Sequence, residues 1–175
     1  MEIERKWLIC RDRIPFQLEK LEKKEIEQIY VSYFPTVRAR KINDGEEYVL
    51  TVKTKTGMDP EGGLARNEFE FPLLSEEYSG LKASAKGKTI RKTRYLFPTD
   101  GGLVMEIDIF HEELDGLAFL EIEFPDVETA RKYPSPEWTV SDITEDRRYK
   151  NSSLAENGKP DFSDDTIFTG KDEQI

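Results

Sequence analysis

The sequence predicts a single α+β domain in which about eight antiparallel strands are accompanied by a few short helices. Charged and apolar residues alternate in short runs along most of the chain, which is the pattern of half-buried strands. Turn-forming residues separate several of these runs, as in Asn43-Asp44-Gly45 and Asp115-Gly116. The length of 175 residues suits one domain with its own hydrophobic core.

The first half of the chain is expected to contain one helix among its strands. Residues 15–27 place apolar residues such as Phe16 and Ile26 among charged ones, which predicts an amphipathic helix. A loop rich in Gly and Pro is expected at residues 56–63. Strands are predicted at residues 2–9, 28–34, 36–42, 47–55 and 65–73.

The second half of the chain continues with strands and adds short helices. Acidic residues follow Ser75 at the start of a helix, and Gly87 is expected as the glycine that ends it. Asp126 is predicted to cap a helix that ends near Tyr133, and Gly158 is predicted to stop the last helix. Further strands are predicted at 89–97, 103–110 and 118–124, a short apolar segment at 138–143, and helices near 145–149 and 151–156.

Composition and charge narrow the possible classes of protein. The chain has 37% hydrophobic and 35% charged residues, and its 11% aromatic content suits a folded core better than disorder. The net charge of −10 argues against broad binding to nucleic acids or to anionic membranes. We expect residues 1–160 to form the domain and residues 161–175 to form a polar, acidic tail.

Two scarce residue types limit the chemistry. Cys10 is the single cysteine, which excludes an intrachain disulfide and a cysteine-cluster metal site. His111 is the single histidine, which excludes zinc sites with several histidines and makes a Ser-His-Asp triad a poor candidate. No apolar window approaches a membrane span, and charged residues follow Met1 directly in place of a signal peptide. These observations predict a cytoplasmic protein whose chemistry depends on carboxylates, lysines and arginines.

The most informative feature is the set of residues at every second position of the predicted strands. Charged side chains occupy these positions, and apolar residues such as Ile3, Ile29 and Val52 fall on the opposite face of the sheet. The acidic pairs of the charged face are Glu2/Glu4, Glu68/Glu70, Glu106/Asp108 and Glu121/Glu123. Its basic residues are Lys6, Arg38, Arg40, Lys53, Lys55, Arg66, Lys92 and Arg94.

A sheet with one face in water is common, and it is the alternative interpretation of this pattern. A solvated face usually mixes Ser, Thr, Gln and Asn with its charges, whereas nearly all of these positions are ionised. Carboxylate oxygens suit hard cations such as Mg²⁺, and lysines and arginines suit an extended phosphate anion. A cation and a polyanion in one site are the requirements of phosphoryl transfer, so the sequence favours a functional face.

These motifs resemble those of the CYTH superfamily, the triphosphate tunnel metalloenzymes, over most of the chain. The opening Glu2-x-Glu4-x-Lys6 matches the signature of the family, and the ordered series of later motifs makes the resemblance specific. The turn at Phe110-His111 departs from the pattern, because small relatives often carry a glycine there. The other matching motifs are Gln28-x-Tyr30, Arg38-x-Arg40, Thr51-x-Lys53, Arg66-x-Glu68-x-Glu70, Ile90-x-Lys92-x-Arg94-Tyr95, Glu106-x-Asp108, Glu121-x-Glu123, and Asp142-Ile143-Thr144 followed by Arg147, Tyr149 and Asn151.

The resemblance implies a closed eight-stranded antiparallel β-barrel whose charged face lines a tunnel, with helices packed on the outside. It also implies that Tyr30 pairs with Lys6 and accepts a proton in catalysis. The acids that would hold one or two Mg²⁺ or Mn²⁺ ions are Glu2, Glu4, Asp108, Glu121 and Glu123. The bases that would bind a triphosphate are Lys6, Arg38, Arg40, Lys53, Lys92 and Arg94, to which we add Lys55 and Arg66 from the same charged face.

The expected function is therefore metal-dependent hydrolysis of inorganic tripolyphosphate to pyrophosphate and phosphate. Other substrates stay open: ATP, for hydrolysis or cyclisation, thiamine triphosphate and long polyphosphate. Cyclisation is disfavoured, because members that resemble class IV adenylyl cyclases carry His-Phe before the signature, and here only Met1 precedes Glu2. A non-catalytic polyphosphate-binding module is the other alternative, but it would need the bases and not the carboxylates. The expected partner is a small triphosphate, without nucleic acid or membrane, and the chain is expected to be a monomer or a homodimer.

Overall fold

The computed structural model describes residues 2–55 and 65–161, so the predicted loop at 56–63 and the tail from residue 162 onward lie outside the described residues. Within these residues the chain forms nine strands and three α-helices. The strands are β1 (Glu2–Ile9), β2 (Glu22–Tyr33), β3 (Thr36–Ile42), β4 (Glu47–Lys55), β5 (Ala65–Pro72), β6 (Lys86–Pro98), β7 (Val104–Phe110), β8 (Ala118–Glu123) and β9 (Thr139–Asp142). The α-helices are α1 (Ser75–Ala83), α2 (Val127–Lys132) and α3 (Asn151–Asn157), and 3₁₀ turns occupy Arg11–Arg13, Leu18–Lys20, Glu112–Leu114 and Arg147–Tyr149.

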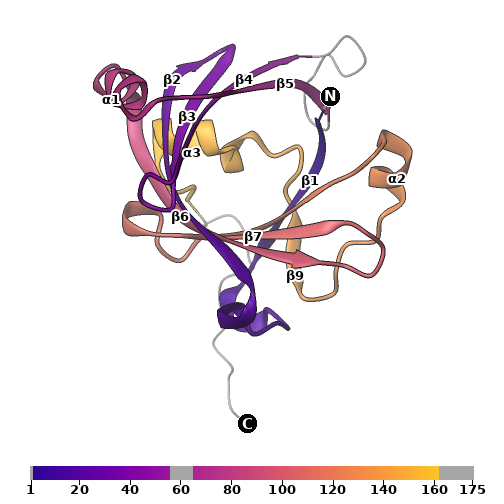
Figure 1. The fold of residues 1–175 in the computed structure, drawn as a ribbon. Helices are drawn as coiled ribbons and strands as arrows, with labels where there is room; N and C mark the ends of the chain where they lie inside the picture. The colour runs from indigo at the N-terminus through magenta and orange to yellow at the C-terminus, as the bar shows by residue number, and fades with distance from the viewer. Residues whose placement is uncertain (1, 56–64, 162–175) are drawn as a thin grey trace.

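Eight of the strands close into an antiparallel barrel (Figure 1). Neighbouring strands follow the order β5-β4-β3-β2-β6-β7-β8-β1, and β1 pairs with β5 to complete the ring. The closing contact is short in the described residues: Glu2 pairs with Arg66, and Ile3 pairs with Ala65. The remaining strand, β9, pairs with the other half of β1 from Trp7 onward. The predicted closed eight-stranded barrel is confirmed.

Alternation along the strands separates a charged interior from an apolar outer face, as the sequence predicts. On one side of the barrel, Ile107 belongs to a buried cluster that includes Ala130 of α2 and Leu18 of an N-terminal 3₁₀ turn. On another side, Tyr78 of α1 lies in a smaller cluster with Ile29 of β2. Figure 1 shows α1 and α2 outside the ring of strands, so helices pack on the outer face as expected.

This cover stops short of β5. Phe69 and Phe71 point outward from β5 and are 54% and 51% exposed. In the described residues α1 contacts β2 and β3, and α2 contacts β1, so these two helices leave the outer face of β5 exposed.

One end of the barrel interior is apolar instead of charged. Leu8, Phe110 and Phe119 lie on the interior faces of their strands and form a buried cluster with Tyr149 and Leu154 from the C-terminal segment. α3 lies across this end of the ring (Figure 1). The charged part of the interior therefore has an apolar floor.

The predicted helix at residues 15–27 is wrong. Only Leu18–Lys20 forms a helical turn, and β2 begins at Glu22. Residues 22–27 pair antiparallel with β6, and Thr93 of β6 donates a hydrogen bond to Glu25 at 2.8 Å. Glu and Lys are good helix formers, but intrinsic propensity is weak compared with tertiary context, so the hydrogen bonds of the strand ladder decide the structure here.

The predicted role of Gly87 is also wrong, because α1 ends at Ala83 and Gly87 lies inside β6. Its φ of +66° suits glycine, and a Cβ there would lie 2.3 Å from the hydroxyl of Tyr33 and 2.4 Å from the carbonyl oxygen of Ala155. Gly87 thus permits the close approach of α3 to β6.

Several predicted turns and caps are confirmed. Asn43 and Asp44 adopt positive φ in the turn between β3 and β4. The Asp126 side chain accepts a hydrogen bond from the backbone N–H of Thr129 and so caps α2, and Gly158 follows α3 with φ of +80°. The helix expected near 145–149 is a 3₁₀ turn. No helix in residues 2–55 or 65–161 has the length and apolar character needed to cross a membrane.

Candidate active site

The interior of the barrel holds a charged cavity of about 430 Å³. Each of the eight barrel strands contributes to its wall, and so does the segment 143–152. The wall carries seven bases, which are Lys6, Arg38, Arg40, Lys53, Arg66, Arg94 and Lys150. It also carries eight acids, which are Glu2, Glu4, Glu68, Glu70, Glu106, Glu121, Glu123 and Asp146. Such near-equal numbers of opposite charges distinguish this cavity from a plain anion-binding site.

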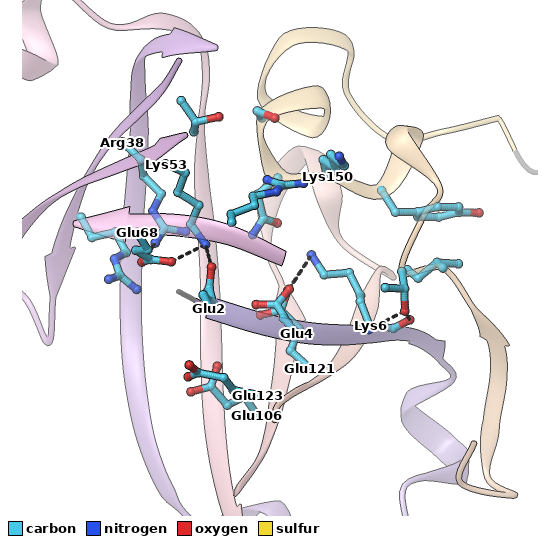
Figure 2. Close-up of a pocket in the computed structure, with 18 of the residues that line it drawn as sticks. Glu2, Glu4, Lys6, Arg38, Lys53, Glu68, Glu106, Glu121, Glu123 and Lys150 are labelled. Atoms are coloured by element: carbon cyan, nitrogen blue, oxygen red, sulfur yellow. Dashed lines mark hydrogen bonds and ion pairs between the residues drawn. The ribbon is translucent and has the colours of Figure 1, made fainter. Parts of the chain in front are cut away.

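Near the start of β1, bases and acids form a chain of ion pairs. Lys53 Nζ lies 2.6 Å from Glu2 Oε2 and 2.7 Å from Glu68 Oε2 (Figure 2). Arg38 approaches Glu68 at 3.5 Å, and Arg40 approaches Glu70 at 2.5 Å. Register explains these contacts, because β4 and β5 pair Lys53 directly opposite Glu68.

Arg38 and Arg40 lack a full set of partners. The buried Nε of each guanidinium has no hydrogen-bond acceptor in the described residues. Burial and the neighbouring charge of Arg38 lower the pKa of Arg40 to about 10. Buried donors without acceptors are unfavourable, so this side of the cavity is suited to an anion.

Around Glu4 the wall is short of positive charge. Burial and the carboxylate of Glu121 raise the pKa of Glu4 to about 7. The shortest ion pair of Glu4 in the described residues is a distant one, 4.0 Å from Lys6 Nζ. Burial, and then the hydrogen bond with Glu68, also raise the pKa of Glu2. Crowded carboxylate oxygens of this kind fit a hard divalent cation.

Glu121 is the best-paired acid of the wall. Lys6 Nζ lies 2.7 Å from one of its oxygens, and Arg94 lies 2.5 Å from the other. Burial acts to raise the pKa of Glu121, but the charges of Lys6 and Arg94 outweigh it and hold the pKa well below its usual range. Glu121 is therefore a carboxylate at neutral pH.

Tyr30 lies at the boundary between the cavity and the apolar floor. Its side chain is only 2% exposed, and its hydroxyl accepts a hydrogen bond from Gln28 Nε2 at 2.8 Å. No hydrogen bond joins Tyr30 to Lys6 in the part of the chain that the structure describes. Burial raises the pKa of Tyr30, which disfavours the proton-acceptor role that the sequence resemblance implies.

Most of the predicted site residues meet on this wall. Lys92 and Asp108 lie outside it, as an ion pair buried beneath the wall. Lys55 is also absent from the wall, and its ammonium group lies 5.8 Å from the exposed ring of Phe34. The predicted residues that do line the cavity are Glu2, Glu4, Lys6, Tyr30, Arg38, Arg40, Lys53, Arg66, Arg94, Glu121 and Glu123.

Comparison with known proteins identifies the family. The chain is 33% identical over 156 residues to an inorganic triphosphatase of Nitrosomonas europaea, which covers 88% of this chain and 96% of that protein. It is also 33% identical over 165 residues to an inorganic triphosphatase of Acetivibrio thermocellus, covering 93% and 98% of the two chains. This chain belongs to the inorganic triphosphatase family. No family model matches the sequence.

Solved structures agree with membership of the inorganic triphosphatase family. The crystal structure of an inorganic triphosphatase superposes with a TM-score of 0.63 at 28% identity, covering 91% of this chain and 97% of that one. A protein of Hippeastrum described as a putative adenylyl cyclase with a dominant triphosphatase activity gives a TM-score of 0.60 at 14% identity, covering 75% and 83%. At that identity the second likeness shows the fold alone.

Sequence reasoning missed part of the triphosphatase cavity. Thr144, Lys150, Asn151 and Ser152 line it from the segment that leads into α3, and the buried Oδ1 of Asn151 has no hydrogen-bond partner in the described residues. Thr144 and Asn151 belong to motifs that match the family, and this match could have identified them as site residues. Alternation could not reveal this part of the wall, because a turn and a helix have no two-residue period.

The donor set fits a divalent cation through its chemistry, although no three acidic side chains in the described residues are already grouped as metal ligands. Lysines pair with several of these acids: Lys53 pairs with both Glu2 and Glu68, and Lys6 pairs with Glu121 and lies 4.0 Å from Glu4. Lys6 and Lys53 therefore neutralise part of the acidic charge, and a cation would compete with these lysines for the same carboxylate oxygens.

Proposed function

We propose that this chain hydrolyses inorganic tripolyphosphate to pyrophosphate and orthophosphate, with Mg²⁺ or Mn²⁺ as cofactor. The observation that carries the proposal is the division of the cavity wall. Arg38 and Arg40 have buried donors without acceptors, whereas Glu4 is a partly exposed carboxyl on the cavity wall with an elevated pKa. One side of the cavity thus favours an anion, and the other favours a cation. Family membership supports the same substrate, because two relatives carry the name inorganic triphosphatase.

The carboxylates give the reason for a metal. Tripolyphosphate carries four to five negative charges, and the acids of the wall would repel it if no cation stood between them. The candidate ligands on the wall are Glu2, Glu4, Glu121 and Glu123. At Glu121 a cation would have to displace the ion pair with Lys6 or with Arg94. When bound, a divalent cation would neutralise the negative charge that develops on the phosphates during transfer.

The bases hold the phosphates and stabilise charge on them. Arg94 carries a guanidinium fixed by Asp108, Glu106 and Glu121, so it donates hydrogen bonds from a preorganised position. Arg38 and Arg40 lie on β3, which is separated from β6 by β2, and Lys53 lies on the next strand, β4. A chain of three phosphates can reach both groups of bases, so its terminal phosphorus is held for in-line attack by water.

A nucleotide has less to gain from this cavity. Tyr30 and Tyr149 are the aromatic residues on its described wall, and they are 2% and 1% exposed. A purine would therefore find no free aromatic face and would displace water from fixed charges. Inorganic tripolyphosphate has no nucleobase, so it does not incur this cost.

A phosphate-release panel tests the proposed function. Tripolyphosphate, ATP, thiamine triphosphate and pyrophosphate are each assayed with Mg²⁺ and with Mn²⁺. We expect tripolyphosphate to be the best substrate and pyrophosphate to be poor, because pyrophosphate cannot reach the cation and the far bases together. Binding of tripolyphosphate without turnover, under either metal, would support a polyphosphate-binding module instead.

Three wider predictions belong to this proposal. We place the enzyme in the cytoplasm, because the single Cys10 suits a reducing compartment. We keep residues 1–160 as the domain, and the state of assembly as monomer or homodimer. Sedimentation of the full chain would decide between one copy and two.

A further inference from the structure

Asp108 matches a family motif whose acids hold metal, yet its carboxylate is already fully used. Its side chain is 0% exposed. Oδ1 accepts a hydrogen bond from Arg94 Nε at 2.7 Å, and Oδ2 accepts one from a terminal nitrogen of Arg94, also at 2.7 Å. Lys92 Nζ donates a further bond to Oδ2 at 2.5 Å. Two parallel bonds from one guanidinium to a carboxylate add both binding energy and geometric specificity.

Lys92 serves the same carboxylate. It is 2% exposed, lies beneath the cavity wall, and pairs with Asp108 in the described residues. Its ammonium group lies 5.6 Å from the ring of Phe110, in the apolar floor. Lys92 does not line the cavity, and its ammonium group supplies a second positive charge to Asp108.

Arg94 is the member of this group that faces the cavity. Its terminal nitrogens also pair with Glu106 and with Glu121, both of which line the wall. The guanidinium therefore has one edge held by Asp108 from below and its remaining donors directed at the wall. Its orientation is fixed before any substrate arrives.

We propose that Asp108, supported by Lys92, is a positioning residue that locks the guanidinium of Arg94 in the cavity wall, and that it is not a ligand of the divalent cation. A cation at Asp108 would have to displace hydrogen bonds from both of its oxygens and stand beside two positive side chains. Glu4 and Glu123 lie on the wall itself, where a cation can reach them.

A direct measurement of metal binding distinguishes a residue that positions Arg94 from a ligand of the cation. Mn²⁺ is titrated into the substrate-free full chain and followed by electron paramagnetic resonance, for wild type, Asp108→Asn and Glu4→Gln. We expect Asp108→Asn to bind Mn²⁺ within about twofold of wild type, and Glu4→Gln to bind at least about tenfold more weakly. Equal weakening in both variants would overturn the proposal.

The second measurement is kcat for tripolyphosphate, and it rests on the proposed function. Asp108→Asn should lower kcat for tripolyphosphate roughly 10–100-fold, the scale for losing the partner that orients a functional side chain. Because Asp108 acts through Arg94, adding Asp108→Asn to Arg94→Ala should change kcat by less than about twofold. Multiplying losses in the double variant would show that Asp108 acts independently of Arg94, and the proposal would fail.

Loss of fold is controlled by a charge-matched variant. Asp108→Asn leaves Lys92 buried without a carboxylate, so the pair Lys92→Met with Asp108→Asn removes both charges together. That variant should keep wild-type Mn²⁺ affinity, and weakened binding in the folded double variant would count against the proposal. If wild type binds Mn²⁺ but releases no phosphate from tripolyphosphate, the proposed function fails while the Mn²⁺ comparison still judges Asp108.

Discussion

Glu4 shows how burial and a neighbouring carboxylate prepare one residue for a cation. Its pKa rises from 4.5 to about 7, because burial and Glu121 both disfavour its charged form. Between these two pH values the unfolded chain loses a proton that the folded chain keeps. The free energy of unfolding of the metal-free protein should therefore fall as pH rises through this window, and stay at the lower level above it.

This decrease in stability with rising pH can be measured against a variant that lacks the Glu4 carboxyl. Relative to Glu4→Gln, metal-free wild type should lose about 1–3 kcal/mol of stability between pH 4.5 and pH 8. Denaturant unfolding of both proteins in the presence of a chelator measures the difference, and the variant serves as the control because it cannot titrate at this position. Identical pH profiles for the two proteins would show that Glu4 titrates normally.

A second single residue, Arg94, is expected to contribute strongly to catalysis. Arg94→Ala should lower kcat for tripolyphosphate roughly 10²–10³-fold, because a preorganised donor to the transferring phosphate is lost. Arg11→Ala is the matched control, since Arg11 is an exposed residue of a 3₁₀ turn outside the barrel. Unchanged kinetics in folded Arg94→Ala would favour a merely solvated charged face.

Among the elements, α3 is the one whose position depends on a single glycine. It packs against β6 at Gly87, where the carbonyl of Ala155 comes within 2.4 Å of the place that a Cβ would take. The same segment carries Asn151 and Ser152 to the cavity wall. Contact between α3 and β6 therefore links packing to the shape of the site.

A pair of glycine variants tests this link. Gly87→Ala should destabilise the fold by roughly 2–4 kcal/mol, because it combines a strained φ with a displaced backbone, and it should also raise KM for tripolyphosphate. Gly80→Ala in α1 meets nothing within 4 Å and should stabilise by about 0.5–1 kcal/mol. Thermal unfolding and steady-state kinetics measure both effects. Equal behaviour of the two variants would remove the role assigned to Gly87.

For the molecule as a whole, the near balance of charge on the cavity wall makes the metal part of substrate binding. Activity should vanish with a chelator and return with Mg²⁺ or Mn²⁺, because the carboxylates otherwise repel the polyanion. Phosphate release before and after metal addition measures this. Full turnover by metal-stripped protein would contradict it.

The cavity as a whole is expected to prefer tripolyphosphate to ATP. The kcat/KM for tripolyphosphate should exceed that for ATP by at least about tenfold, a difference of roughly 1.4 kcal/mol in transition-state binding. The physical reason is the absence of an exposed aromatic ring on the described cavity wall. Equal or better kinetics with ATP would move the nucleotide to first place.

Two-residue alternation was sufficient to predict one charged face and most of the candidate site residues on it, and the family resemblance supplied the expectation that this face lines the interior. Glu2, Glu4 and Lys6 point the same way whatever the strand pairs with, because successive side chains of any strand point to opposite faces. Closure was a different matter. It depends on the pairing of β1 with β5, two segments far apart in the chain, and here the family resemblance supplied the expectation.

Only the tertiary structure decided which charges reach the cavity. The sequence pattern treats Lys92 and Arg94 alike, as it does Asp108 and Glu121, because each pair shares one face. Depth along the barrel distinguishes them, and depth is set by register and by the apolar floor. The same holds for residues 22–27, which carry a helical composition and become a strand because β6 offers them a ladder. Local pattern determines the direction of a side chain, and its surroundings come from partners distant in sequence.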